Sequence, residues 1–157
     1  MEENTTQLAP SEDQVVSQVQ SVFGGDVEHL GTRTRRVTFK VSRGRFYEMC
    51  EMMRDQLNFQ HCTLEFAVDY ETHVQNVVLL TNYENGIMAE VRTDMPNDDL
   101  TVASVTPLWG GANWHERETA ELFGIDFEGH PDMRKLLLPE DYRFFPFRKS
   151  FKVGRLV

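Results

Sequence analysis

The sequence predicts an α+β fold, with a mostly antiparallel sheet and helices on one face, and three observations support this prediction. Apolar residues recur at helical spacing in residues 15–23 and again in residues 46–57. Between these segments, Val37, Phe39 and Val41 alternate with polar residues, as in a half-buried strand. A run of strands joined by turn residues follows, and this order is typical of helices packed on one face of an antiparallel sheet.

The first helix is predicted to begin at a capping box and to end at a pair of glycines. Ser11 is a good N-cap, and Gln14 stands at the third helical position, from which its side chain reaches back to the cap. Gly24 and Gly25 then end the helix. The polar residues 1–10 are expected to form a flexible N-terminus.

Two or three strands are expected after the second helix, which we place over residues 43–57. Asn85-Gly86 is a strong hairpin signal, and residues 69–72 are a weaker one. The acidic stretch 95–99 breaks the strand pattern as a loop. The predicted strands cover residues 62–70, 74–81 and 87–92.

Composition excludes several classes of protein. Hydrophobic residues make up 40% of the 157 residues, which is enough for a folded core. The net charge of −9 opposes phosphate backbones, so no nucleic-acid partner is expected. No apolar run approaches the roughly 20 residues of a membrane-spanning helix. Cys50 and Cys62 are too few for a zinc or iron–sulfur site and are expected to be buried, reduced thiols.

The densest group of charged side chains lies in the stretch NWHERETAELFGIDFEGHP, residues 113–131. Asn113 is a suitable N-cap, and Glu116 follows three residues later, as in a capping box. Gly124 is a suitable stop. These signals predict a helix over residues 114–123.

A metal-dependent hydrolase using His115, Glu116 and His130 is the competing enzymatic hypothesis. A zinc-protease helix requires two histidines one turn apart, and the second histidine is absent here. A pair of carboxylates for acid–base catalysis would come from Glu116, Glu118 and Glu121, but these three side chains do not share one helical face. The chain also has no glycine-rich nucleotide-binding motif.

Two non-catalytic interpretations of this helix remain, and the residues alone do not separate them. Arg117 and Glu121 are one turn apart and would form a weak ion pair on a solvated helix. Alternatively, the helix docks on a partner protein, because tryptophan and arginine are typical anchors of interfaces. Trp109 and Trp114 favour docking.

The last part of the chain combines aromatic and basic residues. A small domain cannot bury all of them, whereas an extended arm laid across a neighbouring protein would use both kinds. An ordinary surface strand is the simpler alternative. The residues concerned are Phe144, Phe145, Phe147 and Phe151, with Arg143, Arg148, Lys149 and Lys152. We therefore divide the chain into a flexible N-terminus (1–10), an α+β domain (11–131) and an extended C-terminal docking arm (132–157).

A longer signature resembles one protein family. It consists of Glu116-Arg117-Glu118, Glu121-Leu122-Phe123, His130, Arg134 and Leu136-Leu137, followed by Leu138-Pro139-Glu140-Asp141 and Pro146-Phe147-Arg148-Lys149. Together with Trp109 and Trp114 before it, this pattern is similar to that of the 30-kDa subunit of respiratory complex I, which is the C subunit of the bacterial NADH–quinone oxidoreductase. The resemblance is dense over residues 88–152.

The resemblance implies a structural and assembly role in the peripheral arm of a proton-pumping membrane oxidoreductase. In this family the 30-kDa subunit holds no cofactor of its own, because flavin and iron–sulfur clusters belong to partner subunits. The implied partners are the 49-kDa-type (D) subunit and the iron–sulfur subunits of B and I type. The implied location is the cytoplasmic face of the cell membrane, with membrane association through the complex only.

The resemblance also implies which residues face partner subunits, while the electron donor stays open. NADH with quinone, and reduced deazaflavin with methanophenazine, are both compatible, because the family includes archaeal reduced-deazaflavin dehydrogenases. An energy-converting hydrogenase subunit and a free-standing adaptor are further alternatives. The expected interface residues are Trp109, Trp114, Glu116, Arg117, Glu118, Glu121, His130, Arg134, Phe147, Arg148 and Lys149.

Overall fold

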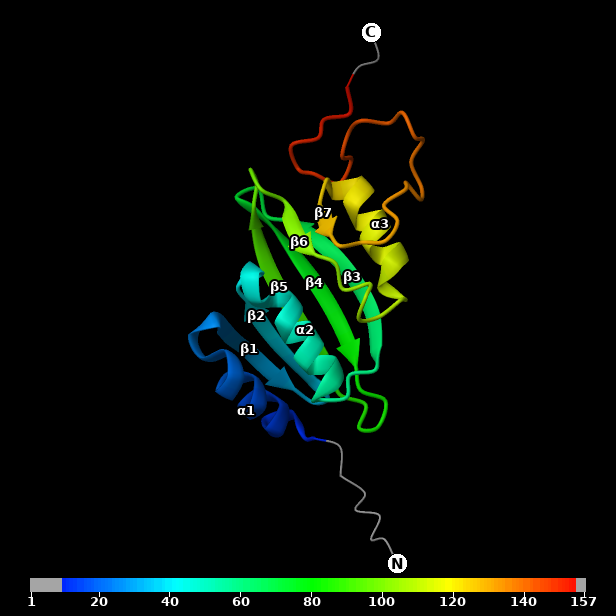
Figure 1. Cartoon of the computed structure of the whole chain (residues 1–157). Helices are drawn as coiled ribbons and strands as arrows, with labels where there is room; N and C mark the ends of the chain where they lie inside the picture. Colours follow the sequence, from blue (N-terminus) through cyan, green and yellow to red (C-terminus); the bar gives the residue numbers. More distant parts are fainter. Residues whose placement is uncertain (1–9, 155–157) are drawn as a thin grey trace, which may run out of the picture.

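A five-stranded sheet forms the centre of the computed structural model, which describes residues 10–154 (Figure 1). The strand order is β1-β2-β5-β4-β3, and β2 and β5 are its one parallel pair. The sheet is therefore mostly antiparallel, as the sequence predicts. The strands are β1 (Val27–Arg33), β2 (Arg36–Val41), β3 (His61–Asp69), β4 (His73–Thr81) and β5 (Met88–Pro96).

Helices α1 (Glu12–Phe23) and α2 (Phe46–Asp55) lie over the same face of the sheet (Figure 1). The predicted capping box of α1 is confirmed, because Ser11 and Gln14 exchange both hydrogen bonds. Short 3₁₀ turns, Gly24–Asp26 and Arg43–Arg45, follow α1 and precede α2. The second helix is thus shorter than the predicted span of 43–57.

The core lies between this face of the sheet and the helices. Val37, Phe39 and Val41 point into it from β2, as their alternation predicts. Buried side chains of α1 and α2, such as Val15 and Met49, pack against them. Cys50 and Cys62 are both free and buried, which confirms the interpretation as reduced thiols.

Three strands, β1, β6 (Thr101–Ala103) and β7 (Asp126–Glu128), go beyond those that the sequence predicts. Strand β1 is a half-exposed edge strand, so its apolar alternation is weak, and a bulge between His29 and Gly31 shifts its register. Strands β6 and β7 form a separate parallel pair of three residues each. The end predicted for β5 at residue 92 is also wrong, because β5 continues to Pro96 along β4.

Helix α3 (Ala112–Phe123) packs along β3, at the edge of the sheet (Figure 1). The segment that leads into it is fixed by Trp109, whose indole N–H donates to the carbonyl of Phe59 at 3.0 Å. Beyond β7, residues 129–154 contain no helix or strand. This segment runs around the C-terminal end of α3 (Figure 1).

The part of this segment after residue 132 corresponds to the predicted C-terminal arm, and it packs on the end of α3. The Phe147 N–H donates to the carbonyl of Leu122 at 3.0 Å. The ring of Phe147 meets Phe123 edge-on, with centroids 5.7 Å apart. Gly124 ends the helix with a φ of 80°, and the ring of Phe145 lies directly over it.

Gly124→Ala is expected to displace the arm. A Cβ at this position would lie 2.8 Å from the Phe145 ring, in addition to the cost of about 1–2 kcal/mol for a left-handed alanine. Gly86→Ala is the matched control, because its φ is 69° but its Cβ would come no closer than 3.7 Å to Arg35. We expect a larger loss of unfolding free energy, and faster proteolysis of the arm, in Gly124→Ala. Equal effects in the two variants would contradict this packing.

Candidate functional site

The helix that carries the signature begins earlier than the sequence predicts. Gly111 occupies the N-cap position, so the assignment of Asn113 as N-cap is wrong. The preceding turn replaces a capping side chain, because the first helical N–H, that of Ala112, donates to the carbonyl of Trp109 at 2.9 Å. Asn113 lies inside the helix, and its carbonyl is 3.2 Å from the Nε2 of His130.

Glu116 is fully buried and anchors the segment between β6 and α3. Its carboxylate accepts hydrogen bonds from Ser104 Oγ (2.5 Å), Val105 N (2.6 Å) and Thr106 Oγ1 (2.9 Å). These three donors offset the cost of burying a carboxylate. Glu116 therefore does not act in a capping box, as the sequence suggested.

A second buried carboxyl group, Glu65 of β3, lies near Glu116. Its Oε1 accepts a hydrogen bond from Asn76 at 2.8 Å, while its Oε2 has no partner among the described residues. Burial, and then repulsion by Glu116, raise the pKa of Glu65 well above its ordinary range. Both effects favour the protonated, uncharged form of Glu65.

Sequence reasoning missed Glu65 for a geometrical reason. In regular alternation a residue between Leu64 and Phe66 would be assigned to the polar face. A bulge between Cys62 and Leu64 instead turns Glu65 toward the core. A lone glutamate in an apolar strand pattern was the available signal.

His130 holds the loop after β7 against α3. Its Nδ1 accepts from the Asp132 N–H at 3.0 Å, so its Nε2 carries the hydrogen and donates to the Asn113 carbonyl. Both ring nitrogens are thus engaged, although Nε2 also lies 3.7 Å from Glu116.

The three residues of the hydrolase hypothesis are not assembled into a site. His130 and Glu116 are neighbours, but His115 does not join them. Among residues 10–154, no group of three or more His, Cys, Asp or Glu side chains could hold a metal ion. The hydrogen bonds of His130 and Glu116 indicate structural roles for both.

Arg117 and Glu121 bind the backbone of the arm and not each other. The ion pair that the solvated-helix alternative expected between them does not form. Arg117 donates to the carbonyls of Arg134 (2.7 Å) and Lys135 (3.3 Å). The nearly buried Glu121 accepts from three consecutive N–H groups, those of Leu136, Leu137 and Leu138, at 3.1, 2.7 and 3.1 Å. Charge-assisted bonds to a fixed backbone are stronger than an exposed pair one turn apart.

Lys135 and Asp69 fix the rest of the arm in the same way. The Lys135 ammonium donates to the carbonyls of Pro139 and Glu140 at 3.1 Å each, and to that of Tyr142. At the end of β3, Asp69 accepts from Arg148 Nε at 2.8 Å and from the Lys149 N–H at 2.9 Å. Burial acts to raise the pKa of Asp69, but these bonds outweigh it and lower that pKa.

The expected interface residues divide into three groups in the structure. Trp109, Glu116, Glu121 and the His130 side chain are buried. Arg117 and Arg148 are half-buried through their bonds to the chain itself. The exposed residues are Trp114, Glu118, Arg134, Phe147 and Lys149. Contact of any of them with a partner subunit stays a prediction.

Comparison with known proteins identifies the family. The family model of the respiratory-chain NADH dehydrogenase 30-kDa subunit matches residues 39–156. The chain belongs to this family, as its signature predicts. Membership makes it one component of a complex I-like membrane oxidoreductase built from several subunits. None of the helices in residues 10–154 has the length and apolar character needed to cross a bilayer.

Relatives of known name come from bacteria and archaea. The C subunit of the NADH-quinone oxidoreductase of Laribacter hongkongensis is 32% identical over 94% of this chain and 80% of its own length. The C subunit of the F(420)H(2) dehydrogenase of Methanosarcina mazei is also 32% identical, over 74% of this chain and 76% of its own.

Two solved structures share the fold. A chain of the membrane-bound sulfane sulfur reductase, an archaeal respiratory membrane complex, has a TM-score of 0.79 at 27% identity and covers 90% of this chain and 85% of its own. A trypsin-resistant fragment of Nqo5 has a TM-score of 0.64 at 31% identity, over 76% of this chain and 97% of the fragment.

Glu121→Ala is expected to lower the free energy of unfolding by about 2–4 kcal/mol, because three N–H groups of the arm lose a charged acceptor. Glu118→Ala, on the exposed face of the same helix, should change it by less than about 0.5 kcal/mol. Chemical denaturation of both variants measures the difference. Similar values for the two would show that the Glu121 bonds do not hold the arm.

Glu65→Gln is expected to flatten the pH dependence of stability. The folded state keeps the Glu65 proton above the ordinary pKa of 4.5, whereas the unfolded state loses it there. The free energy of unfolding of the natural protein therefore falls as pH rises above about 4.5, by about 1.4 kcal/mol for each unit of pKa shift.

A glutamine keeps the shape of Glu65 and does not ionise. Chemical denaturation at pH 4 and pH 8 should show that the free energy of unfolding of Glu65→Gln, relative to that of the natural protein, is higher at pH 8 than at pH 4. The exposed Glu84→Gln serves as control and should parallel the natural protein. A Glu65→Gln curve parallel to that of the natural protein would mean that Glu65 ionises normally.

Proposed function

We propose that this chain is a non-catalytic scaffold subunit that docks on the 49-kDa-type subunit, near the quinone-reducing module. One observation carries the proposal: two charged residues of the α3 signature, Arg117 and Glu121, bind the backbone of the arm. Arg117 and Glu121 fix residues 134–138, so they shape a surface. Groups engaged in this way do not offer a free acid, base or nucleophile to a substrate.

The side chains that stay exposed around this anchor are suited to protein contact. Trp114 on α3 and Phe144 and Phe147 on the arm are large aromatic residues with more than half of their surface accessible. Aromatic residues, phenylalanine included, are enriched at the core of protein interfaces, and tryptophan is enriched among the residues that dominate binding energy. Their position beside the anchored backbone supports a docking role.

The proposed partners and redox chemistry follow from the family. The 49-kDa-type subunit and the iron–sulfur subunits of B and I type would lie beside this chain, and partner subunits would hold the flavin and clusters of the complex. We place the chain on the cytoplasmic face of the membrane, held there by the complex. Similarity to the bacterial and the archaeal relative supports two donor and acceptor pairs, NADH with quinone and reduced deazaflavin with methanophenazine.

The proposal is tested by purifying the tagged full chain from native membranes in mild detergent. Mass spectrometry should identify the 49-kDa-type subunit and cluster-bearing proteins among its partners. The donor-side subunit in the same preparation would distinguish NADH from deazaflavin, or from a hydrogenase. Recovery of the chain alone from the soluble fraction would contradict the proposal and favour a free-standing adaptor.

Trp114→Ala is expected to weaken assembly without lowering stability. Trp114 is 66% exposed, so its loss should change the free energy of unfolding by less than about 0.5 kcal/mol. An aromatic anchor contributes about 2 kcal/mol to binding, which corresponds to roughly 30-fold weaker association. Tyr83→Ala is the matched control, since Tyr83 is 65% exposed and lies in the turn between β4 and β5. Equal recovery of partners with both variants would remove Trp114 from the interface.

A further inference from the structure

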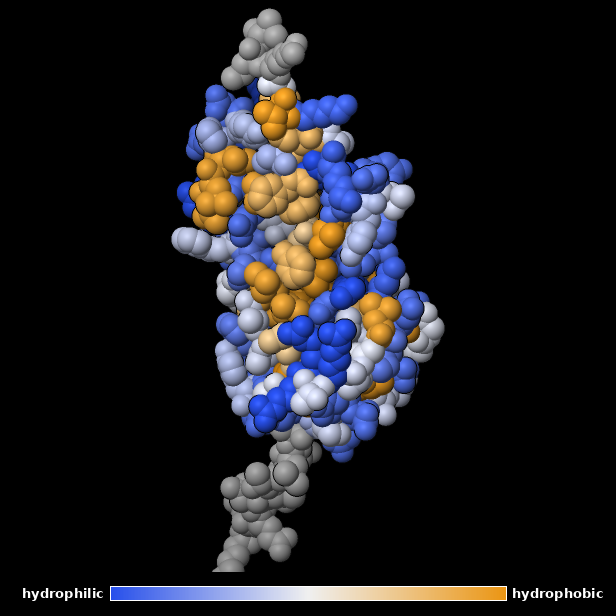
Figure 2. Space-filling view, turned by 180° about the vertical axis from the view of Figure 1, so that it is seen from behind, coloured by the Kyte–Doolittle hydropathy of each residue, from blue (hydrophilic) through white to orange (hydrophobic). Residues whose placement is uncertain are grey.

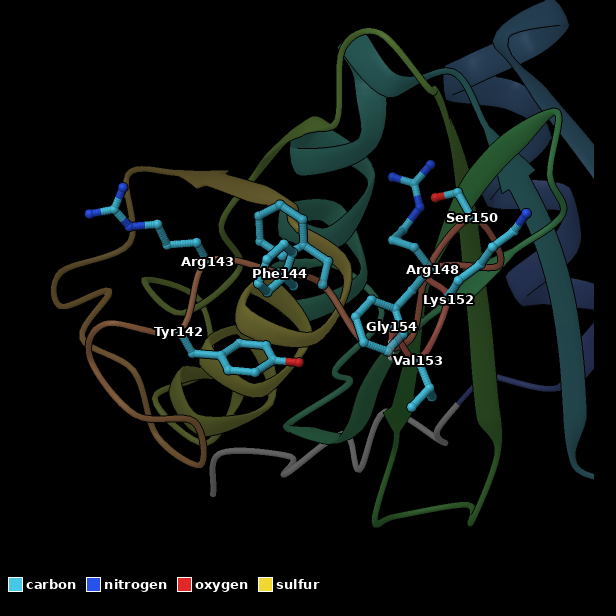
Figure 3. Close-up of a pocket in the computed structure, with 10 residues that line it drawn as sticks. Tyr142, Arg143, Phe144, Arg148, Ser150, Lys152, Val153 and Gly154 are labelled. Atoms are coloured by element: carbon cyan, nitrogen blue, oxygen red, sulfur yellow. The ribbon is translucent and has the colours of Figure 1, made fainter. Parts of the chain in front are cut away.

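An open apolar hollow of about 660 Å³ lies along the arm, and no helix or strand of residues 10–154 fills it. Its lining comes entirely from residues 142–154. Figure 3 shows Tyr142 and Phe144 on one side, with Arg148, Lys152 and Val153 on the other. Apolar side chains dominate its walls, so transfer of an apolar side chain from water into the hollow would be favourable. The apolar lining residues are Tyr142, Phe144, Phe145, Phe151 and Val153.

The hollow is basic in an acidic chain. Residues 142–154 contain Arg143, Arg148, Lys149 and Lys152 and no Asp or Glu, while the whole chain has a net charge of −9. Arg148 is neutralised by Asp69 at 2.8 Å. Arg143 and Lys152 line the hollow and form no ion pair with any other residue of the described part of the chain. An occupant with carboxylates would therefore be attracted at two points.

An apolar surface continues from the arm onto the sheet. The helix-free face of β3 and β4 carries Leu64, Phe66, Val68 and Leu79, none of which is buried. Viewed from behind, hydrophobic surface runs from the region of the arm down the middle of this face (Figure 2). A single bulky ligand would not use this whole length, whereas an extended chain would.

We propose that the hollow and this sheet face form one docking surface for an extended segment of a partner subunit. The segment places a large apolar side chain in the hollow and acidic residues beside Arg143 and Lys152. Its remaining apolar residues lie along β3 and β4. This inference rests on the proposed function and specifies which chemistry the partner presents. A phospholipid surface is disfavoured, because adhesion to anionic lipid generally uses a cluster of about 4–8 basic residues. Here Arg148 and Lys149 are paired with Asp69 and Glu71, and only Arg143 and Lys152 have no ion pair among the described residues.

Photocrosslinking in the intact complex identifies the occupant. Phe144, 64% exposed in the hollow, is replaced by p-benzoylphenylalanine in the tagged full chain, and the irradiated complex is digested for mass spectrometry. We expect crosslinks to one partner segment that contains both apolar and acidic residues. The same photoreactive residue at Tyr83, outside the surface, should not give this crosslink.

Charge reversal tests the electrostatic part. Arg143→Glu should reduce recovery of the partner about tenfold at low ionic strength, with the deficit shrinking as salt is added. Arg33→Glu is the matched control, because Arg33 is also exposed and lies on β1, at the opposite edge of the sheet from β3. Changing the crosslinked carboxylate of the partner to lysine should restore its binding to the Arg143→Glu variant. The same change should not strengthen its binding to the natural chain.

The outcomes are distinct. Crosslinks from Phe144 to phospholipid, to this chain itself or to a segment without acidic residues would overturn the inference while the complex remains intact. Equal effects of Arg143→Glu and Arg33→Glu would do the same. Recovery of the natural chain without any partner would instead contradict the proposed function. The docking surface would then have no partner segment to bind.

Discussion

The rest of this structure depends on the hydrogen bonds that the buried carboxylate of Glu116 accepts. This carboxylate joins the segment after β6 to α3 through one backbone and two hydroxyl donors. Without those donors the buried carboxyl group would have unsatisfied oxygens, which is costly at this depth. With them, α3 is held in one orientation against β3. That orientation decides where Arg117 and Glu121 point, and therefore where the arm runs.

The arm is held through its backbone more than through its side chains. Arg117, Lys135 and Glu121 bind carbonyl and N–H groups between residues 134 and 142. Asp69 adds a bond to the Lys149 N–H at the far end. Because the anchoring groups recognise the main chain, aromatic side chains such as Phe144 and Phe147 are left accessible. Helix α3 thus fixes the path of the arm and leaves the aromatic side chains of the arm exposed.

The sequence predicted what depends on local pattern, and it failed where distant segments meet. The capping box at Ser11, the core positions of β2 and the turn at Asn85 follow from periodicity and turn chemistry. The roles of Glu116 and Glu121 do not, because their partners lie 10–17 residues away and are partly backbone groups with no sequence signature. Glu65 was hidden by a bulge, which alternation does not reveal.

The parallel pairing of β2 with β5 determines when the chain can acquire its core during synthesis. β1 and β2 are consecutive in the chain and pair as a hairpin, but the second neighbour of β2, strand β5, begins only at Met88. Until β5 has left the ribosome, Val37 and Phe39 have no complete sheet to join. Asp69 and Arg148 are 79 positions apart, so this contact of the arm forms only after Arg148 has been synthesised. A chain that ends before Arg148 therefore lacks the contacts that hold the arm to the end of β3.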